Sequence, residues 1–236
     1  MATYKGIQGY SVQKLSGDPT ASSDTEGQLF YNSGSGKFKI TAGGAGAWAS
    51  GGDVNTARYY GAGAGLQTAA LFAGGDSPTQ PPVPTTIVTE SYNGSAWTEV
   101  NDMTDGLVKR APFGTSTSMM VAGGDPGAVT DAESWDGTSW TAAPALNTGG
   151  RQRGGYGASN TQGGAVDGRG GPPTNTYMKV HEEFNGTAWA EAADTNTGRS
   201  GSFTTGKSSS AAICTGGFTP SLTALSETWN GTSWSE

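Results

Sequence analysis

The stretch Glu90-Ser-Tyr-Asn-Gly-Ser-Ala-Trp97 decides the architecture of this 236-residue chain, because its layout recurs three more times. Each copy begins with glutamate, has an aromatic residue third, Asn or Asp before glycine at positions four and five, and tryptophan last. The other copies are Glu133-Ser-Trp-Asp-Gly-Thr-Ser-Trp140, Glu182-Glu-Phe-Asn-Gly-Thr-Ala-Trp189 and Glu227-Thr-Trp-Asn-Gly-Thr-Ser-Trp234. The tryptophans follow one another at 43, 49 and 45 residues. Such a period is typical of arrays in which each repeat is one supersecondary unit.

Each copy of the motif predicts a β-hairpin. Asn-Gly between two short strand-like runs favours a two-residue type I′ turn, whose central residues both need positive φ. We therefore expect one strand to end at 90–92, Asn93-Gly94 to form the turn, and the next strand to occupy 96–100. The aromatic residue before the turn and the tryptophan after it can then stack across the hairpin.

A second landmark opens each unit: an arginine 10 to 13 residues after a tryptophan, followed by an apolar strand closed by a glycine pair. The arginines are Arg58, Arg110, Arg151 or Arg153, and Arg199, and the glycine pairs are Gly74-Gly75, Gly123-Gly124, Gly170-Gly171 and Gly216-Gly217. In the third unit Asp167-Gly168-Arg169 interrupts the apolar strand. Four short strands per unit make one blade of a β-propeller. We predict an all-β fold, a small propeller of four four-stranded blades, with five blades as the alternative.

Closure of this propeller has two solutions. Trp48 is a further tryptophan that lacks the glutamate lead-in. Either its segment packs at the seam between the first and the last of four blades, or residues 1–50 build a fifth, irregular blade. Unpaired sheet edges invite aggregation, so we expect one of the two arrangements to join the ends.

The glycine pair at the end of the second strand, followed by an aromatic residue and a tryptophan, resembles the kelch repeat. The sequence from Asn55 through Gly74-Gly75 to Trp97 is also similar to kelch-like repeats in structural proteins of marine tailed phages. The resemblance covers residues 41–236. It implies a propeller displayed on a virion as capsid decoration, head fibre or tail fibre, with host adhesion as one use.

Residues 1–40 do not fit the repeat. The run 27–40 predicts a plain hairpin around Asn-Ser-Gly-Ser-Gly, and 16–24 has the composition of a linker. The sequence of this segment is similar to the N-terminal region of phage fibre and virion proteins. This resemblance implies attachment to other virion proteins. The alternative is an extra hairpin that closes the propeller. We accordingly divide the chain into an attachment segment at 1–40 and a propeller at 41–236, and expect a virion protein made in the host cytoplasm.

Composition argues against several partners. The chain has 13 Lys+Arg against 20 Asp+Glu, a formal charge of −7, and no basic stripe that would follow a nucleic-acid backbone. No apolar run approaches the roughly 20 residues of a membrane helix, and the N-terminus lacks the apolar part of a secretory signal. Cys214 stands alone, so we expect a small core residue rather than a disulfide.

Catalytic constellations are not apparent. His181 is the single histidine and cannot hold a metal by itself, and no Ser/His/Asp set can be assembled around it. Paired loop carboxylates could hydrolyse sugars at a propeller mouth, but the candidates share no local motif. They are Asp53, Asp76, Asp125 and Asp167. We expect no enzyme, cofactor or metal, since the fold alone gives no activity.

Binding candidates come from two sets. Arg58, Arg110, Arg153 and Arg199 recur once per blade. They either pair with the repeat acids or carbonyls, or form an axial ring that binds an anion or an acidic sugar. Tyr60 and Tyr156 are loop aromatics that could contact host surface glycans, which makes a carbohydrate-binding lectin module the alternative function. We assign a structural role to the repeat tryptophans Trp97, Trp140, Trp189 and Trp234, and leave association of the chain with its own copies open.

Overall fold

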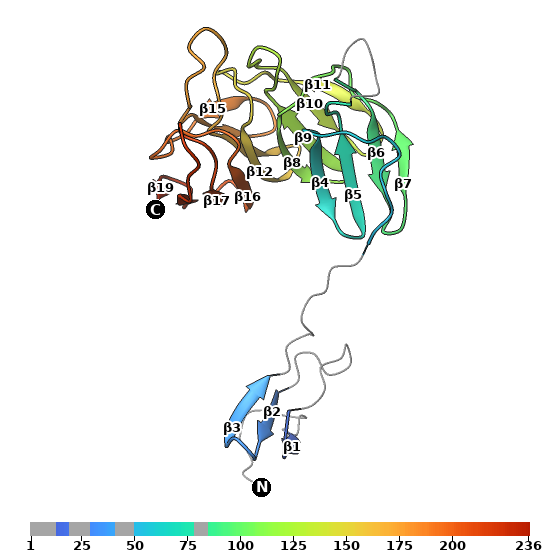
Figure 1. Ribbon diagram of the computed structural model, residues 1–236, viewed down its shortest axis with the longest axis vertical. Helices are drawn as coiled ribbons and strands as arrows, with labels where there is room; N and C mark the ends of the chain where they lie inside the picture. Colours follow the sequence, from blue (N-terminus) through green and yellow to red (C-terminus); the bar gives the residue numbers. More distant parts are fainter. Residues whose placement is uncertain (1–12, 19–28, 41–49, 78–84) are drawn as a thin grey trace. The chain divides into compact units, whose positions relative to one another are not determined.

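The computed structural model describes residues 13–18, 29–40, 50–77 and 85–236 (Figure 1). The chain divides into two compact units, residues 1–50 and 51–236. All regular elements of the described residues are β-strands, so the predicted all-β class is confirmed. The part of the chain that the structure describes offers no helical segment able to cross a lipid bilayer.

The first unit holds a three-stranded sheet. Its strands are β1 (Gln13–Leu15), β2 (Leu29–Asn32) and β3 (Lys37–Ile40), in that order. The predicted hairpin is β2 paired antiparallel with β3. Strand β1, which pairs parallel with β2, was not predicted. Asp18 follows β1 and pairs with Lys39 of β3 at 2.8 Å. Trp48, which we expected at the seam, lies outside the described residues.

The second unit consists of four antiparallel sheets of four strands each, which are the blades of a small β-propeller. The first blade contains β4 (Ala62–Leu66), β5 (Ala69–Ala73), β6 (Thr89–Tyr92) and β7 (Trp97–Val100). The second contains β8 (Ala111–Thr115), β9 (Ser118–Ala122), β10 (Ala132–Trp135) and β11 (Trp140–Ala143). The third contains β12 (Gly154–Ser159), β13 (Gln162–Val166), β14 (His181–Phe184) and β15 (Trp189–Glu191). The fourth contains β16 (Phe203–Ser208), β17 (Ala211–Thr215), β18 (Ser226–Trp229) and β19 (Trp234–Ser235).

Strands within each blade follow chain order, as the repeat predicted. The first strand of every blade is the innermost one. These inner strands lie beside one another in the order β4, β8, β12, β16 (Figure 1). Successive repeats of the sequence therefore become successive blades around one axis.

The core lies between the blades. Alternation along each strand gives a blade two faces, and we call the face that carries the motif tryptophan the Trp face. Leu71 of the first blade packs against Met119, Val121 and Trp140 on the Trp face of the second. Similar clusters join the second blade to the third and the third to the fourth. Burial of one such large apolar side chain contributes about 1.5–3 kcal/mol.

The predicted aromatic stacking within each hairpin is present. Ring centroids are 5.0 Å apart for Tyr92–Trp97, 5.5 Å for Trp135–Trp140, 5.1 Å for Phe184–Trp189 and 5.5 Å for Trp229–Trp234. Each pair lies on the Trp face. In the second, third and fourth blades the pair therefore covers the outer half of the joint with the preceding blade.

The predicted turn type is wrong. Four residues, 93–96, connect β6 to β7, and only Gly94 among them has positive φ, at 94°. The side-chain Oδ1 of Asn93 accepts hydrogen bonds from the backbone N–H groups of Ser95 and Ala96, each at 3.0 Å. This Asx geometry explains why Asn or Asp precedes the glycine. Asp136, Asn185 and Asn230 make the same pair of bonds.

The glycine pair assigned to the third blade is also wrong. Asp167 and Gly168 follow β13 with φ of 56° and 115°, matching 61° and 114° at Gly74 and Gly75. Gly170-Gly171 lies further along the loop. Aspartate tolerates the left-handed region better than most residues, and here its buried carboxylate contacts Arg199.

Candidate functional site

The glutamate that opens each motif copy forms a buried ion pair with the arginine of its own blade. The side chains of Arg58, Arg153 and Arg199 and of their glutamates are fully closed to solvent. Nitrogen–oxygen distances are 2.5 Å for Arg58–Glu90, 3.0 Å for Arg110–Glu133, 3.2 Å for Arg153–Glu182 and 2.5 Å for Arg199–Glu227. The pair links the third strand of a blade to the segment that leads into its inner strand.

The second carboxylate oxygen holds the connection between blades. Glu182 Oε2 accepts bonds from the backbone N–H of Asn147 at 2.7 Å and from the Asn147 side chain at 3.0 Å. The same amide group donates to the carbonyl of Trp189 at 3.1 Å. Asn55 and Asn196 repeat this arrangement in the first and fourth blades, and Thr104 donates to Glu133 in the second.

These contacts keep Glu90 charged. Burial alone would favour the neutral acid at Glu90, but bonds from the Asn55 and Thr56 backbone and from Arg58 outweigh it and hold the pKa of Glu90 below its usual value. Removing either charge would leave the other buried without a partner, which is costly. The repeat acids and arginines therefore hold each blade together.

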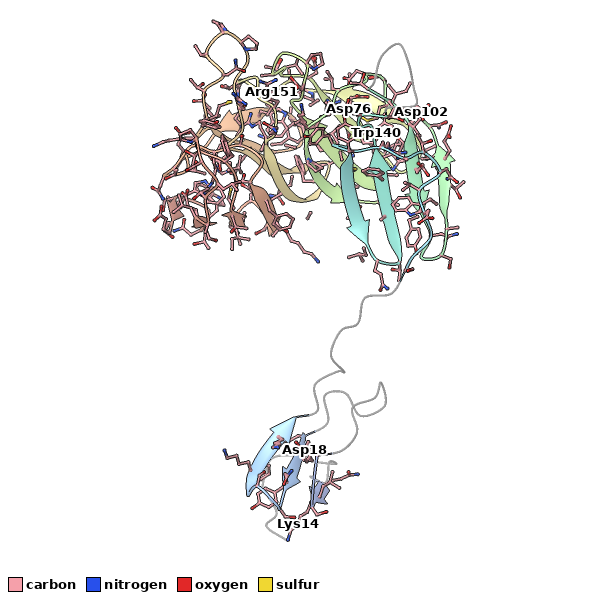
Figure 2. All side chains as sticks on the ribbon, viewed as in Figure 1. Lys14, Asp18, Asp76, Asp102, Trp140 and Arg151 are labelled. Carbon is pink, nitrogen blue, oxygen red and sulfur yellow. The ribbon has the colours of Figure 1, made fainter. Side chains whose placement is uncertain are left out.

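The four arginine candidates thus occupy the geometry of the first alternative, pairing with the repeat acids. Arg153 also lines the cavity described below, whereas Arg58, Arg110 and Arg199 are not among its lining residues. Arg151, which is labelled in Figure 2, is a different case: it contacts Asp125 at 2.8 Å and Asn175 at 2.7 Å. Binding of an anion by the arginines stays a prediction.

Tyr156 lies in a buried polar network between the third and fourth blades. Its hydroxyl donates to Glu183 at 2.7 Å and lies 2.8 Å from His181 Nε2. Trp234 of the next blade donates from Nε1 to His181 Nδ1 at 3.2 Å. Since Nδ1 accepts, the proton of a neutral His181 sits on Nε2 and is donated to Tyr156.

Burial lowers the pKa of His181 to about 4, and nearby Arg153 acts in the same direction. Burial, with the neighbouring Glu183 carboxylate, raises the pKa of Tyr156. Both groups are therefore neutral near pH 7. Sequence reasoning missed this network, although one signal existed: His181 occupies the strand position of Thr89 in the first blade, which accepts a bond from the tryptophan of the second.

Asp167, Arg199 and Cys214 form a second buried cluster. Arg199 Nε contacts Asp167 at 2.9 Å, and the Cys214 thiol donates to the same carboxylate at 3.2 Å. Burial raises the pKa of Cys214, and the negative charge of Asp167 raises it further. A buried, protonated thiol is a poor nucleophile.

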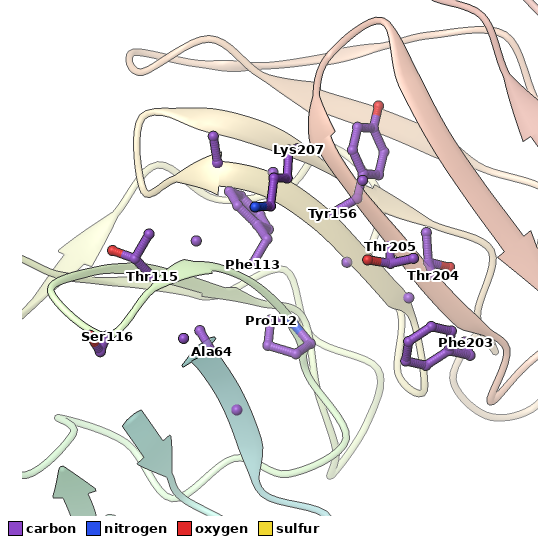
Figure 3. Close-up of a pocket in the computed structure, with 18 of the residues that line it drawn as sticks. Ala64, Pro112, Phe113, Thr115, Ser116, Tyr156, Phe203, Thr204, Thr205 and Lys207 are labelled. Carbon is purple, nitrogen blue, oxygen red and sulfur yellow. The ribbon is translucent and has the colours of Figure 1, made fainter. Parts of the chain in front are cut away.

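The four inner strands line an axial cavity of about 720 Å³ (Figure 3). Residues of β4, β8, β12 and β16 form its wall. The polar side chains labelled in Figure 3 are Thr115, Ser116, Tyr156, Thr204, Thr205 and Lys207. The described residues that line it include Arg153 and Lys207 but no Asp, Glu, His or Cys. Arg153 is closed to solvent in its ion pair with Glu182, so Lys207 is the exposed charged side chain among these lining residues.

Tyr60, the other predicted contact, lies on the residue run just before the inner strand. Its side chain is 53% exposed, its φ is 58°, and Lys109 Nζ lies 4.9 Å from the ring centroid. Lys109 and Gln152 occupy the same position in the next two blades, also with positive φ, and Gly201 does so in the fourth. Backbone bonds run from Lys109 N to Tyr60 O, Gln152 N to Lys109 O, and Gly201 N to Gln152 O.

The loop acids do not gather in one place. Asp125 pairs with Lys109 at 2.9 Å and with Arg151, Asp167 is buried beside Arg199, and Asp76 shares a backbone bridge with Tyr59. Over the described ranges, no group of three His, Cys, Asp or Glu side chains could hold a metal ion. No family model matches the chain, and a search of curated proteins finds no match either.

Proposed function

We propose that this chain is a non-enzymatic structural protein of a tailed-phage virion, which displays the propeller for surface adhesion or particle stabilisation. The observation that carries the proposal is the fate of the repeated motif. All four of its glutamates are buried against arginines of their own blades, so the chemistry that repeats builds a scaffold. The resemblance of the repeat to phage structural proteins then supplies the setting.

Two further features support this function. The chain carries a separate compact unit N-terminal to the propeller, which suits a division between attachment and display. The axial cavity offers backbone groups and hydroxyls rather than an acid or a nucleophilic thiol among its described lining residues. Binding rather than bond cleavage is the chemistry that such a lining supports.

Incorporation into particles tests the proposal. The gene for this chain is deleted from the phage that encodes it. The full chain or a chain lacking residues 1–40 is then produced in cells infected by that phage. We expect the full chain to band with purified virions. The truncated chain should stay in the soluble fraction, with its thermal unfolding transition intact. Equal incorporation of the truncated chain would contradict attachment through this segment.

A carbohydrate-binding module is the second candidate, and Tyr60 favours it. Tyr59 and Tyr60 lie with ring centroids 4.8 Å apart, each 53% exposed, and Lys109 caps the Tyr60 ring. A non-glycine residue at positive φ costs roughly 1 kcal/mol or more, so the Tyr60 side chain is held there against a penalty. Exposed aromatic rings beside polar groups suit sugar binding.

The variant Tyr60→Gly separates binding from stability. Glycine accepts a φ of 58° without strain, so the melting temperature should not fall. Glycan-array binding by the full chain should be lost in this variant and retained in Ile87→Ala, which truncates an exposed side chain elsewhere in the first blade. A blank array for the unmodified chain would contradict the carbohydrate-binding role.

A further inference from the structure

The joint between blades is made in the same way three times. In each, the Trp face of one blade packs on the opposite face of the blade before it. Tryptophan Nε1 donates across every joint: Trp140 to Thr89, Trp189 to the Pro144 carbonyl and Trp234 to His181. Four blades joined in a row leave one face of each kind at the two ends.

The opposite face of the fourth blade is the first free end. Phe203 and Ile213 point from it and are 67% and 37% exposed. The corresponding side chains in the second blade, Ala111 and Met120, are buried against the third blade. Large exposed apolar side chains on one sheet face mark an interaction surface.

The Trp face of the first blade is the second free end. Trp97 and Tyr92 are half-buried there, whereas Trp135 and Trp140 of the second blade are buried. In the described part of the chain it is the connection at 50–58 that contacts this face, where Trp97 Nε1 donates to the Gly52 carbonyl at 3.1 Å.

Backbone contacts confirm that these ends do not meet each other. The run of bonds from Tyr60 through Lys109 and Gln152 stops at Gly201, and no backbone bond joins Gly201 to Tyr60 in the described residues. A Cβ built on Gly123 would strike the Gly150 carbonyl of the next blade. At Gly216, the equivalent position in the fourth blade, the nearest atom is the Thr223 carbonyl of its own loop at 3.8 Å.

We propose that the free face of the fourth blade binds the free Trp face of the first blade in a second copy of this chain. Two chains joined head to tail at both ends form a ring of eight blades. The two faces are the complementary halves of a joint that the chain already makes three times, which is why a copy of the chain is the occupant. Head-to-tail contacts generate rings when the rotation closes, and propellers typically have four to eight blades.

The mass of the full chain in solution tests the proposal. One chain is 23.8 kDa, so the ring is 2 × 23.8 = 47.6 kDa. We expect light scattering behind size exclusion to give the two-chain mass at micromolar concentrations. A one-chain mass, or a mass above two chains, would overturn the ring.

Two variants on opposite faces test the joint itself. Ile213→Lys places a charge on the fourth-blade face, and Gly63→Arg places one on the Trp face of the first blade, where a Cβ meets nothing closer than 3.9 Å. Each should reduce the mass to one chain while leaving thermal unfolding of the blades intact. The control Ile87→Lys alters a 40% exposed side chain that precedes β6 and belongs to no strand of either face, and it should keep the two-chain mass.

Mixing the two variants distinguishes head-to-tail from face-to-face pairing. Gly63→Arg keeps an intact fourth-blade face and Ile213→Lys keeps an intact first-blade face, so one joint can form between them. Native mass spectrometry of the mixture should show a species with one chain of each kind. Two-chain species in either variant alone, or their absence from the mixture, would overturn the head-to-tail joint.

Discussion

Trp140 of the second blade donates from its indole Nε1 to the hydroxyl of Thr89 in the first blade over 3.0 Å, and both side chains are buried (Trp140 is labelled in Figure 2). The bond ties the last strand of one repeat to the third strand of the repeat before it. A buried indole N–H cannot donate to water instead. Loss of its acceptor therefore lowers stability more than loss of a surface hydrogen bond.

Thr89→Val should therefore destabilise the propeller. The change keeps the shape of the side chain and removes the acceptor, leaving a buried N–H unpaired at a cost of about 1–3 kcal/mol. Urea unfolding followed by tryptophan fluorescence measures it. The control Thr98→Val alters an exposed strand residue of the same blade. Equal stability of the two variants would show that the bond contributes nothing.

Glu182→Gln should be among the most damaging single changes. It leaves the buried Arg153 guanidinium without a charged partner. Loss of one partner of a buried pair typically lowers the free energy of unfolding by about 3–5 kcal/mol. The double variant Arg153→Met/Glu182→Leu should be less destabilised than the single one, because it leaves no unpaired charge. Glu191→Gln, on the exposed side of β15, serves as the control and should unfold like the unmodified chain.

Asp136 should be replaceable by asparagine and not by alanine. Its Oδ1 accepts bonds from the backbone N–H groups of Thr138 and Ser139, each at 2.8 Å, and asparagine does the same in the other three repeats. Those two bonds also hold the pKa of Asp136 below its usual value, and the bond from Ser139 has the larger effect. Asp136→Asn should keep the melting temperature and Asp136→Ala lower it; a reversed order in differential scanning calorimetry would contradict the Asx role.

His181 should make the propeller sensitive to acid. Its pKa is about 4 in the folded chain, whereas the ordinary histidine value of 6.5 applies in the unfolded chain. The unfolded chain therefore takes up the proton first as pH falls. The stability is complete above pH 6.5 and declines toward pH 4, by about 3 kcal/mol for this shift.

Comparison with His181→Gln isolates this effect, because Arg153, Tyr156 and Glu183 face the same site in both proteins. The two unfolding free energies, measured by urea titration at pH 7, 5 and 4, should converge as the pH falls. A constant difference across this range would contradict a neutral, buried His181.

The sequence predicts the blades well because their determinants are local. Glutamate, aromatic residue, glycine turn and tryptophan lie within eight residues, and each hairpin folds around them. The turn geometry was missed because Asn93 uses its side chain rather than a left-handed backbone. The place of Asp167 at the first position of the third glycine pair was missed because its partner, Arg199, belongs to the next blade.

The candidate sites were harder to predict, since they depend on contacts between blades. Trp234 and His181 are 53 residues apart, and nothing near either residue indicates the other. The arginines were recognised as a set, but pairing and axial binding could not be separated without the inner-strand positions. Exposure of Phe203 and Ile213 also has no local sign, because their strands resemble those of the buried blades.

A quantitative mass-spectrometric inventory of purified virions tests the proposed function most directly, with the virions taken from a phage whose genome encodes this chain. The account predicts peptides from both units of the chain, in a fixed ratio to the major capsid protein and unchanged after high-salt washing. Peptides confined to the lysate, with none in the washed particles, would contradict a virion role for this propeller.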